Sequence, residues 1–297
     1  MVKKKVNLEN QDDPSENGSQ EGVLDNELND SPGLIEQIKY KVGKQSWFLD
    51  LKICFCVLTR IPIYVGIAPE DFSISKASRF FPIVGAVIGL FASIVLWIGS
   101  WFDFPANLLA LFALLTLTLL TGALHEDGLA DTCDGLGGGG TRDQKLKIMR
   151  DSQIGSYGAM ALILSFGLRW AAYTEITEQG VGHILAALIS IAAGSRAALP
   201  VIMYLIPLAR EDGLSASAGK PSFDRAITAL LIGIGFLLFI LGFRISIVAL
   251  GLSVLTAGLF VYFVATRIGG QTGDVLGAVQ QIIEVTILLA IIMVEIE

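Results

Sequence analysis

The stretch FPANLLALFALLTLTLLTGALHEDGLADTCDGLGGGG, residues 104–140, joins a long apolar run directly to four carboxylates and a run of glycines. The apolar part is about as long as the roughly 20 residues that an α-helix needs to cross a bilayer. The carboxylates therefore fall where the chain leaves the hydrocarbon. This order of residues predicts a membrane helix that leads into an ionic site.

The whole chain has the composition of a multi-pass membrane protein. Of its 297 residues, 53% are hydrophobic, and the mean hydropathy is +0.64. We predict the all-α fold class, as a polytopic helical bundle with six or seven transmembrane helices. The expected spans are approximately 80–100, 105–124, 157–177, 184–207, 227–243, 246–265 and 275–294.

The N-terminal part of the chain differs from the rest. Residues 1–33 are rich in acidic and polar residues, and we predict a disordered acidic tail there. Residues 34–297 form the predicted membrane-embedded domain. Its first part, 34–62, mixes basic and apolar residues with Trp47 and Phe48, which is typical of an amphipathic helix lying in the membrane interface. No cleaved secretory signal is expected, because no apolar core follows the first lysines.

Basic residues fall almost entirely in loops on one side of the predicted spans, and the positive-inside rule makes that side cytoplasmic. The outer loops carry only Arg244. The acids and glycines of 125–140 face the same side as the basic loops, so we expect a site on the cytoplasmic face. No basic stripe with interleaved aromatics is present, and nucleic-acid binding is not expected. The inner loops carry Lys76, Arg79, Arg142, Lys145, Lys147, Arg150, Arg210, Lys220, Arg225 and Arg267.

Three aspartates form the strongest chemical pattern. If the helix continues past the membrane surface, Asp127, Asp131 and Asp134 lie at i, i+4 and i+7, about 40° apart on one face. Oxygen-only ligands favour Mg²⁺, Mn²⁺ or Ca²⁺, and we expect these three residues to hold such an ion. Glu126 points about 100° away and is a candidate base or a partner of the ligands. The alternative is a solvated helix end.

Two further groups of residues complete the predicted site. Gly135 and the glycines of 137–140 permit positive φ and close backbone approach, as phosphate-binding loops require. Basic residues of the same loops are candidates to bind phosphate oxygens, although the positive-inside rule is the better explanation for the two lysines; they are Arg142, Lys145, Lys147, Arg150 and Arg210. A single histidine beside the acids, His125, lacks the partners for a zinc site, and we interpret it as a hydrogen-bonded interfacial residue.

Charged residues inside predicted spans are costly unless they are paired or line a cavity. Arg196 and Glu284 form an ion pair in one interpretation and contact substrate in another. For Arg169 we favour snorkelling or a structural pair. Together the residues indicate metal-assisted phosphoryl or phosphodiester transfer at a membrane surface.

Six motifs follow one another along the chain: LTRIP at 58–62, FFPIVGAVIG at 80–89, HEDGLADTCDGLGGG at 125–139, KIMRDSQIGSYGAMAL at 147–162, SRAA at 195–198 and TGDVLGAVQQIIEV at 272–285. In sequence and in order they resemble the motifs of the cobalamin synthases, the adenosylcobinamide-GDP ribazoletransferases. The resemblance implies the final step of adenosylcobalamin biosynthesis, in which α-ribazole or its 5′-phosphate attacks adenosylcobinamide-GDP and releases GMP. It also implies a Mg²⁺ cofactor and the bacterial cytoplasmic (inner) membrane, and it leaves a homo-oligomer open.

The same resemblance supplies the predicted roles of individual residues. It implies metal ligation or base catalysis for the acidic motif, which consists of Glu126, Asp127, Asp131 and Asp134. It implies contact with phosphate or metal for the segment after the glycines, which consists of Arg150, Asp151 and Ser152. It implies that residues from other helices close the site, namely Arg196, Asp274 and Glu284.

Other classes of protein remain as alternatives. A CDP-alcohol phosphotransferase also holds metal with helical aspartates, but DTCDG at 131–135 meets only half of that pattern. A prenyltransferase would need a second aspartate-rich motif. A divalent-cation transporter would need polar groups through the bilayer, whereas these acids gather at one face.

Overall fold

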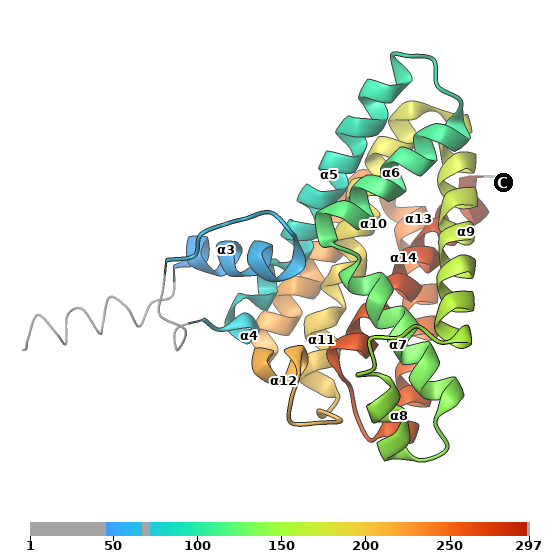
Figure 1. Cartoon of the computed structure of the whole chain (residues 1–297). Helices are drawn as coiled ribbons and strands as arrows, with labels where there is room; N and C mark the ends of the chain where they lie inside the picture. Colours follow the sequence, from blue (N-terminus) through green and yellow to red (C-terminus); the bar gives the residue numbers. More distant parts are fainter. Residues whose placement is uncertain (1–45, 67–71, 296–297) are drawn as a thin grey trace, which may run out of the picture. The chain divides into compact units, whose positions relative to one another are not determined.

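A computed structural model describes residues 46–66 and 72–295, and this part of the chain is almost entirely helical. The predicted all-α class is confirmed (Figure 1). The predicted tail, 1–33, and residues 34–45 of the predicted interfacial helix lie outside the described residues. The elements are α3 (Trp47–Leu58), α4 (Ile74–Ala77), the 3-10 helix η2 (Ser78–Phe80), α5 (Phe81–Ser100), α6 (Ala106–Thr121), α7 (Leu124–Gly138), α8 (Arg142–Ile148), α9 (Ser156–Gln179), α10 (Val181–Ala197), α11 (Leu199–Leu205), α12 (Leu214–Ala218), α13 (Phe223–Ile268) and α14 (Gly273–Glu295).

The helix that contains residues 105–124 does not continue straight into the acidic segment, as the sequence suggested. α6 ends at Thr121, and α7 turns away from it by 86°. Two consecutive residues, Gly122 (φ 65°) and Ala123 (φ 59°), take left-handed backbone conformations there. The side chain of Arg60 lies where a Cβ of Gly122 would be, so both this contact and the positive φ favour glycine at this position.

Four helices are long and apolar enough to cross a membrane, or five spans if α6 and α7 count as one bent pair. The four are Ile74–Ser100, Val181–Leu205, Phe223–Ile268 and Gly273–Val294. The prediction of six or seven differs for two reasons. α9 has sufficient length, but it carries Arg169, Glu175 and Glu178 and is less apolar. α13 is counted as one of the four, although a break in its backbone divides it into two helices, as the sequence suggested.

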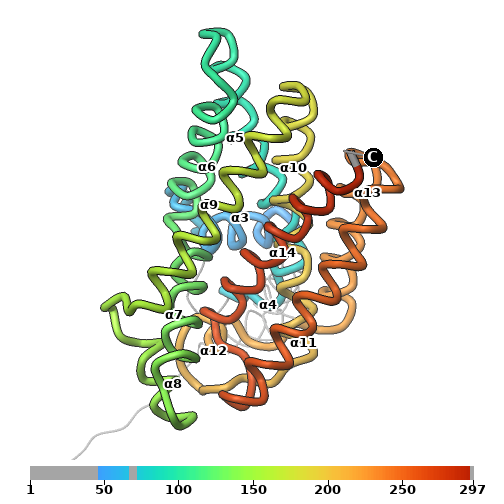
Figure 2. The backbone as a smooth tube through the Cα atoms, turned by 90° about the vertical axis from the view of Figure 1, so that its right-hand side faces the viewer, coloured from blue at the N-terminus to red at the C-terminus, as the bar shows by residue number. Residues whose placement is uncertain are grey.

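A residue with non-helical backbone angles divides α13 into two parts. Its 46 residues correspond to about 69 Å of helix, more than twice the hydrocarbon thickness of a bilayer. Gly242 (φ 79°, ψ 171°) breaks the helical geometry, and Figure 2 shows the chain doubling back in this region. Both parts line one apolar cavity, with Leu237 from the first and Leu250 from the second. The break matches the boundary predicted between 227–243 and 246–265.

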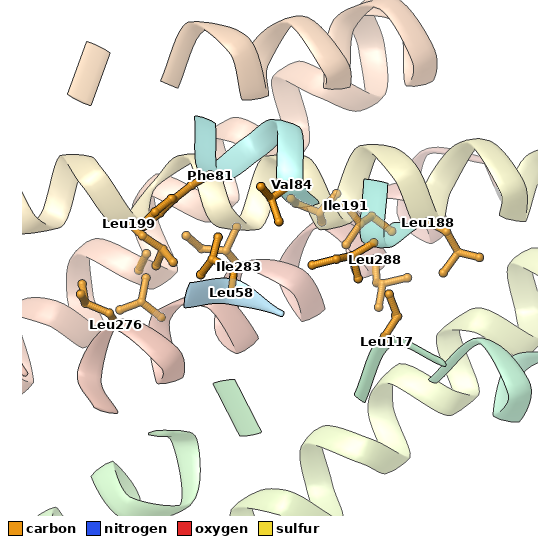
Figure 3. Close-up of a cluster of buried hydrophobic side chains, with 14 of the residues drawn as sticks. Leu58, Phe81, Val84, Leu117, Leu188, Ile191, Leu199, Leu276, Ile283 and Leu288 are labelled. Atoms are coloured by element: carbon orange, nitrogen blue, oxygen red, sulfur yellow. The ribbon is translucent and has the colours of Figure 1, made fainter. Parts of the chain in front are cut away.

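The core depends on close helix contacts made by small residues. Gly85 and Gly89 of α5 pack directly on the backbone of α10, and a Cβ at either position would overlap the carbonyl oxygen of Ala192 or Leu188. Ser93, one turn further on, donates a hydrogen bond to the Leu185 carbonyl oxygen at 3.0 Å. This spacing of small residues is a common way for membrane helices to approach. Figure 3 shows the apolar side chains that fill the adjoining space, including Val84, Ile191 and Leu288.

Helix α3 packs against this bundle through a buried carboxylate. Asp50 is fully buried and pairs with Arg79 at 2.7 Å and Arg225 at 3.3 Å. Burial raises the pKa of Asp50, and the two arginines oppose that effect. Trp47 and Phe48, at the start of α3, expose 64% and 53% of their surface. The exposed aromatic side chains at the start of α3 agree with the predicted position of this helix in the membrane interface.

The contact between α5 and α10 can be tested by adding one methyl group. Gly85→Ala forces the two helices apart, and we expect a loss of about 1–3 kcal/mol in the free energy of unfolding. The matched control is Gly251→Ala in α13, where nothing lies within 4 Å of the added Cβ and the change should stay within about 1 kcal/mol. Thermal unfolding in detergent measures both. Equal effects of the two substitutions would contradict this packing.

Candidate functional site

A cavity between α3, α5, α7, α11, α12 and α14 contains the charged groups of the candidate site. Its apolar walls include Leu58, Phe81 and Leu199, and its charged residues are Asp127, Arg210 and Asp274. In Figure 1, α7, α12 and the start of α14 gather at the same end of the bundle. Apolar walls around a few ionic groups are typical of small-molecule sites.

Asp127 and Asp274 meet in this cavity because α7 and α14 cross on two glycines. A Cβ at Gly128 would lie 2.7 Å from the Asp274 carbonyl oxygen, and a Cβ at Gly277 would lie 3.1 Å from that of His125. A side chain at Gly128 would therefore prevent this close approach, and one at Gly277 would force its neighbour to shift by a few tenths of an ångström. Asp127 immediately precedes Gly128, and Asp274 lies nearly one helical turn before Gly277. The crossing thus places both carboxylates in one cavity.

Arg210 brings positive charge to the same cavity. Its Nη2 donates to Asp274 Oδ2 at 3.1 Å, and its Nε lies 3.6 Å from Asp212 Oδ1. The loop that carries it is fixed by backbone hydrogen bonds on either side of Leu208, from Ala209 N to Gln271 O at 2.9 Å and from Gln271 N to Pro207 O at 2.8 Å. The predicted proximity of Arg210 and Asp274 to the acidic helix therefore has a structural basis.

Asp131 lies next along α7 and experiences strong negative potential. α7 is short and polar and lies outside the four long apolar helices. Burial is the largest cause that raises the pKa of Asp131, to about 7, followed by repulsion from Asp127, Asp274 and Asp134; Arg210 opposes the shift. A cation bound among these carboxylates would relieve the repulsion.

Asp134 has a different environment from the other two aspartates. Its two carboxylate oxygens accept hydrogen bonds from the backbone amides of Gly155 at 2.7 Å and Gly158 at 2.8 Å, at the start of α9. Side chains at these glycines would overlap the carboxylate. Asp134 therefore anchors the N-terminus of α9 to α7.

The structure does not gather the predicted metal ligands into one cluster. Within residues 46–66 and 72–295, no group of three His, Cys, Asp or Glu side chains is arranged to hold a metal ion. Asp127 and Asp134 are separated by about 10.5 Å along the helix axis, although they share one face. Metal binding by Asp127, Asp131 and Asp134 stays a prediction.

Glu126 and Glu284 belong to a buried polar network outside the cavity. Arg169 Nη1 lies 3.1 Å from Glu126 Oε1 and 3.4 Å from Glu284 Oε1. Gln280 donates to Glu284 Oε2 at 2.7 Å, and Tyr173 donates to its Oε1 at 3.1 Å. The arginine that neutralises Glu284 is thus Arg169 from α9, and this confirms the structural pair expected for Arg169.

Arg196 does not form the suggested ion pair with Glu284. Its Nη1 donates to the Ala192 carbonyl oxygen of the same helix at 3.0 Å, and its Nε has no hydrogen-bond partner among the described residues. It is nearly fully buried and lies near enough to Glu284 and Glu126 for electrostatic attraction. Arg196, like Glu126 and Glu284, does not line the cavity that holds Asp127.

The segment after the glycine run lies at the surface. Arg150, Asp151 and Ser152 are exposed. Arg150 pairs with Asp212, and Asp151 Oδ1 accepts a hydrogen bond from Gln153 N at 3.1 Å. Through Asp212, Arg150 is connected to Arg210 and so to the cavity, whereas Asp151 and Ser152 make no such contact in the described part of the chain.

The glycine run is not a phosphate-binding loop with positive φ, contrary to expectation. α7 continues to Gly138, and none of the glycines from 135 to 140 has positive φ. They permit close packing instead, with Met149 against Gly135 and Tyr157 against Gly137. Arg142 and Lys145 are also structural. Arg142 donates to the carbonyl oxygens of Ile268 and Ala209, and Lys145 to those of Leu136 and Gly139.

Sequence reasoning missed three features of the site. His125 is buried against the cavity, and its Nε2 has no partner in the described part of the chain, so it is not the hydrogen-bonded interfacial residue that we expected. The Gly128–Gly277 crossing and the bridging Asp212 were not identified. A glycine beside each acid, in HEDG and TGDVLG, was the available signal for the crossing.

Long apolar helices around a cavity with acids and an arginine define a multi-pass membrane protein with an ionic ligand site. The chain belongs to the cobalamin-5-phosphate synthase family, whose sequence model matches residues 50–292.

Curated relatives agree with this assignment, and each is named adenosylcobinamide-GDP ribazoletransferase. The protein of Bradyrhizobium diazoefficiens is 47% identical over 81% of this chain and 92% of its own. That of Azorhizobium caulinodans is 42% identical over 79% and 91%, and that of Shewanella putrefaciens 39% identical over 84% and 97%. No solved structure matches the chain.

The repulsion at Asp131 predicts a pH-dependent effect on stability. Because its folded-state pKa is raised, ionisation of Asp131 destabilises the fold as the pH rises from the ordinary value of 3.8 through about 7. In metal-free protein, Asp131→Asn should therefore unfold a few degrees above wild type at pH 8.5, and the difference should shrink at pH 5.5. Millimolar Mg²⁺ should reduce the gap at pH 8.5. A difference that is independent of pH would contradict the electrostatic explanation.

Proposed function

We propose that this protein transfers α-ribazole, or its 5′-phosphate, to adenosylcobinamide-GDP and releases GMP, completing the nucleotide loop of cobalamin. Its family and the names of its relatives support the reaction. The main structural support is the cavity in which Asp127, Asp274 and Arg210 converge from three segments. The transfer requires carboxylates that bind a metal ion and, beside them, an arginine that binds phosphate.

The bond changes follow from the substrates. A ribose hydroxyl oxygen of the acceptor bonds to the phosphorus on the corrinoid side of the diphosphate. The P–O bond to GMP breaks, and GMP leaves with the bonding electrons. A cavity carboxylate oxygen that does not bind the metal accepts the hydroxyl proton. Arg210 donates to phosphate oxygens, and the apolar walls at Leu58, Phe81 and Leu199 limit access of water.

We propose Mg²⁺ as the cofactor, held between Asp127 of α7 and Asp274 of α14 with Asp131 beside them. The described residues do not form a three-ligand cluster, so binding of the ion would draw these carboxylates closer together. Their oxygen ligands and the mutual repulsion at Asp131 fit a hard divalent cation. Asp134 was predicted as the third ligand, but the amides of Gly155 and Gly158 occupy its oxygens, so Asp274 takes that place here. When bound, Mg²⁺ neutralises charge on the phosphates during transfer.

The proposed location is the bacterial inner membrane, with the site on the cytoplasmic face. The concentration of Lys and Arg in the loops near α7, α8 and α12 supports this orientation. Within this proposal, Glu126 and Glu284 support the site through the interior network that fixes α7 against α9 and α14. Arg196 contributes electrostatic attraction to both carboxylates.

Metal dependence and the role of Asp127 can be measured in one assay. Membranes containing the protein receive adenosylcobinamide-GDP and α-ribazole with Mg²⁺ or with chelator, and GMP and adenosylcobalamin are separated by chromatography. We expect both products only with Mg²⁺. Asp127→Asn or Asp274→Asn should lower the rate by about 100-fold or more, because each removes a direct ligand.

The control for this assay is Asp143→Asn, which removes an exposed carboxylate paired with Arg142 and should leave the rate unchanged. Full turnover by folded Asp127→Asn protein would exclude the proposed metal site. Absence of both products from folded wild-type protein would overturn the proposed reaction.

A further inference from the structure

Asp212 connects two arginines at the edge of the cavity. Arg150 Nη2 contacts both carboxylate oxygens of Asp212, and Arg210 Nε lies 3.6 Å from its Oδ1. The two arginines come from different segments of the chain, before α9 and before α12. A single carboxylate thus holds two guanidinium groups together.

Arg210 has hydrogen-bond donors that are not used in the described part of the chain. Its side chain is only 14% exposed, and its Nε and Nη1 are buried without a hydrogen-bond partner among the described residues. Its one hydrogen bond to a side chain, from Nη2, goes to Asp274. Buried donors without a partner are costly, and a ligand that accepts hydrogen bonds would remove that cost.

The ion pairs around Asp212 are exchangeable. The side chain of Asp212 is 61% exposed and that of Arg150 is 51% exposed, so solvent screens their interaction. The following residue, Gly213, has φ 87°, a conformation that glycine adopts without strain. Guanidinium groups bind carboxylate and phosphate in the same planar, two-pronged manner. A phosphate could therefore replace the Asp212 carboxylate between the two arginines.

We propose that Asp212 occupies the position of a substrate phosphate in the ligand-free protein and competes with the nucleotide anion for Arg150 and Arg210. Asp212 is thus a specificity-determining residue that weakens binding of the guanosine nucleotide and promotes release of GMP. This inference rests on the proposed function, which supplies the identity of the anionic ligand. The inference predicts that removal of the Asp212 carboxylate strengthens binding of the nucleotide, whereas removal of a contact residue usually weakens it.

The experiment measures binding of GMP, with Mg²⁺ and without corrinoid, to the full-length protein in detergent by isothermal titration calorimetry. Asp212→Asn should bind GMP about two- to fivefold more tightly than wild type, as expected for loss of a competing exposed ion pair. Arg210→Gln should bind it more weakly. The matched control is Glu211→Gln, which removes one negative charge from the neighbouring residue. Glu211 is exposed and forms no ion pair with the described residues.

Unchanged or weaker binding of GMP by folded Asp212→Asn protein would overturn the inference, because an anchoring role for Asp212 predicts that result. Equal strengthening by Glu211→Gln would also overturn it and assign the effect to net charge. Turnover by wild-type protein separates this failure from failure of the proposed function. If wild type forms adenosylcobalamin and GMP, a negative result with Asp212→Asn concerns Asp212 alone.

Discussion

The crossing of α7 and α14 on Gly128 and Gly277 is the contact on which the rest of the site depends. Because neither residue has a side chain, the two backbones approach closely enough for Asp127 and Asp274 to enter one cavity. The same approach places Gln281 of α14 within 3.4 Å of Glu126, so the interior network continues from the crossing. A larger residue at Gly128 would separate the acids and the network together.

The two neighbours Glu126 and Asp127 show how one helix serves two environments. Successive helical side chains point about 100° apart, so Asp127 faces the cavity while Glu126 faces Arg169. Arg169 and Glu284 are almost completely buried, and isolated charges at such depth would be strongly unfavourable. Sharing Arg169 between Glu126 and Glu284 compensates them and ties α7, α9 and α14 to one another. The ionic cavity is therefore supported by ion pairs in an otherwise apolar interior.

Local sequence pattern predicted the helices and the acidic face of α7, because hydropathy and i, i+4 spacing are properties of a single segment. It did not predict the 86° bend, since the bend needs two consecutive residues in left-handed conformation and one of them is Ala123, a residue type that gives no signal for it. It also assigned Asp134 to metal without knowing that α9 begins beside it. The partner of Glu284 was missed for the same reason. Both Arg169 and Arg196 were visible as intramembrane charges, but only the packing of α9 on α14 decides which one pairs.

We propose that carboxylates of α7 and α14 act on one metal ion. The most direct measurement is a structure of the protein with Mn²⁺ in place of Mg²⁺, in which anomalous scattering locates the ion. We expect one Mn²⁺ in the cavity in contact with carboxylate oxygens of both Asp127 and Asp274. An ion held by α7 residues alone, or located away from the Gly128–Gly277 crossing, would show that the two helices do not share a metal.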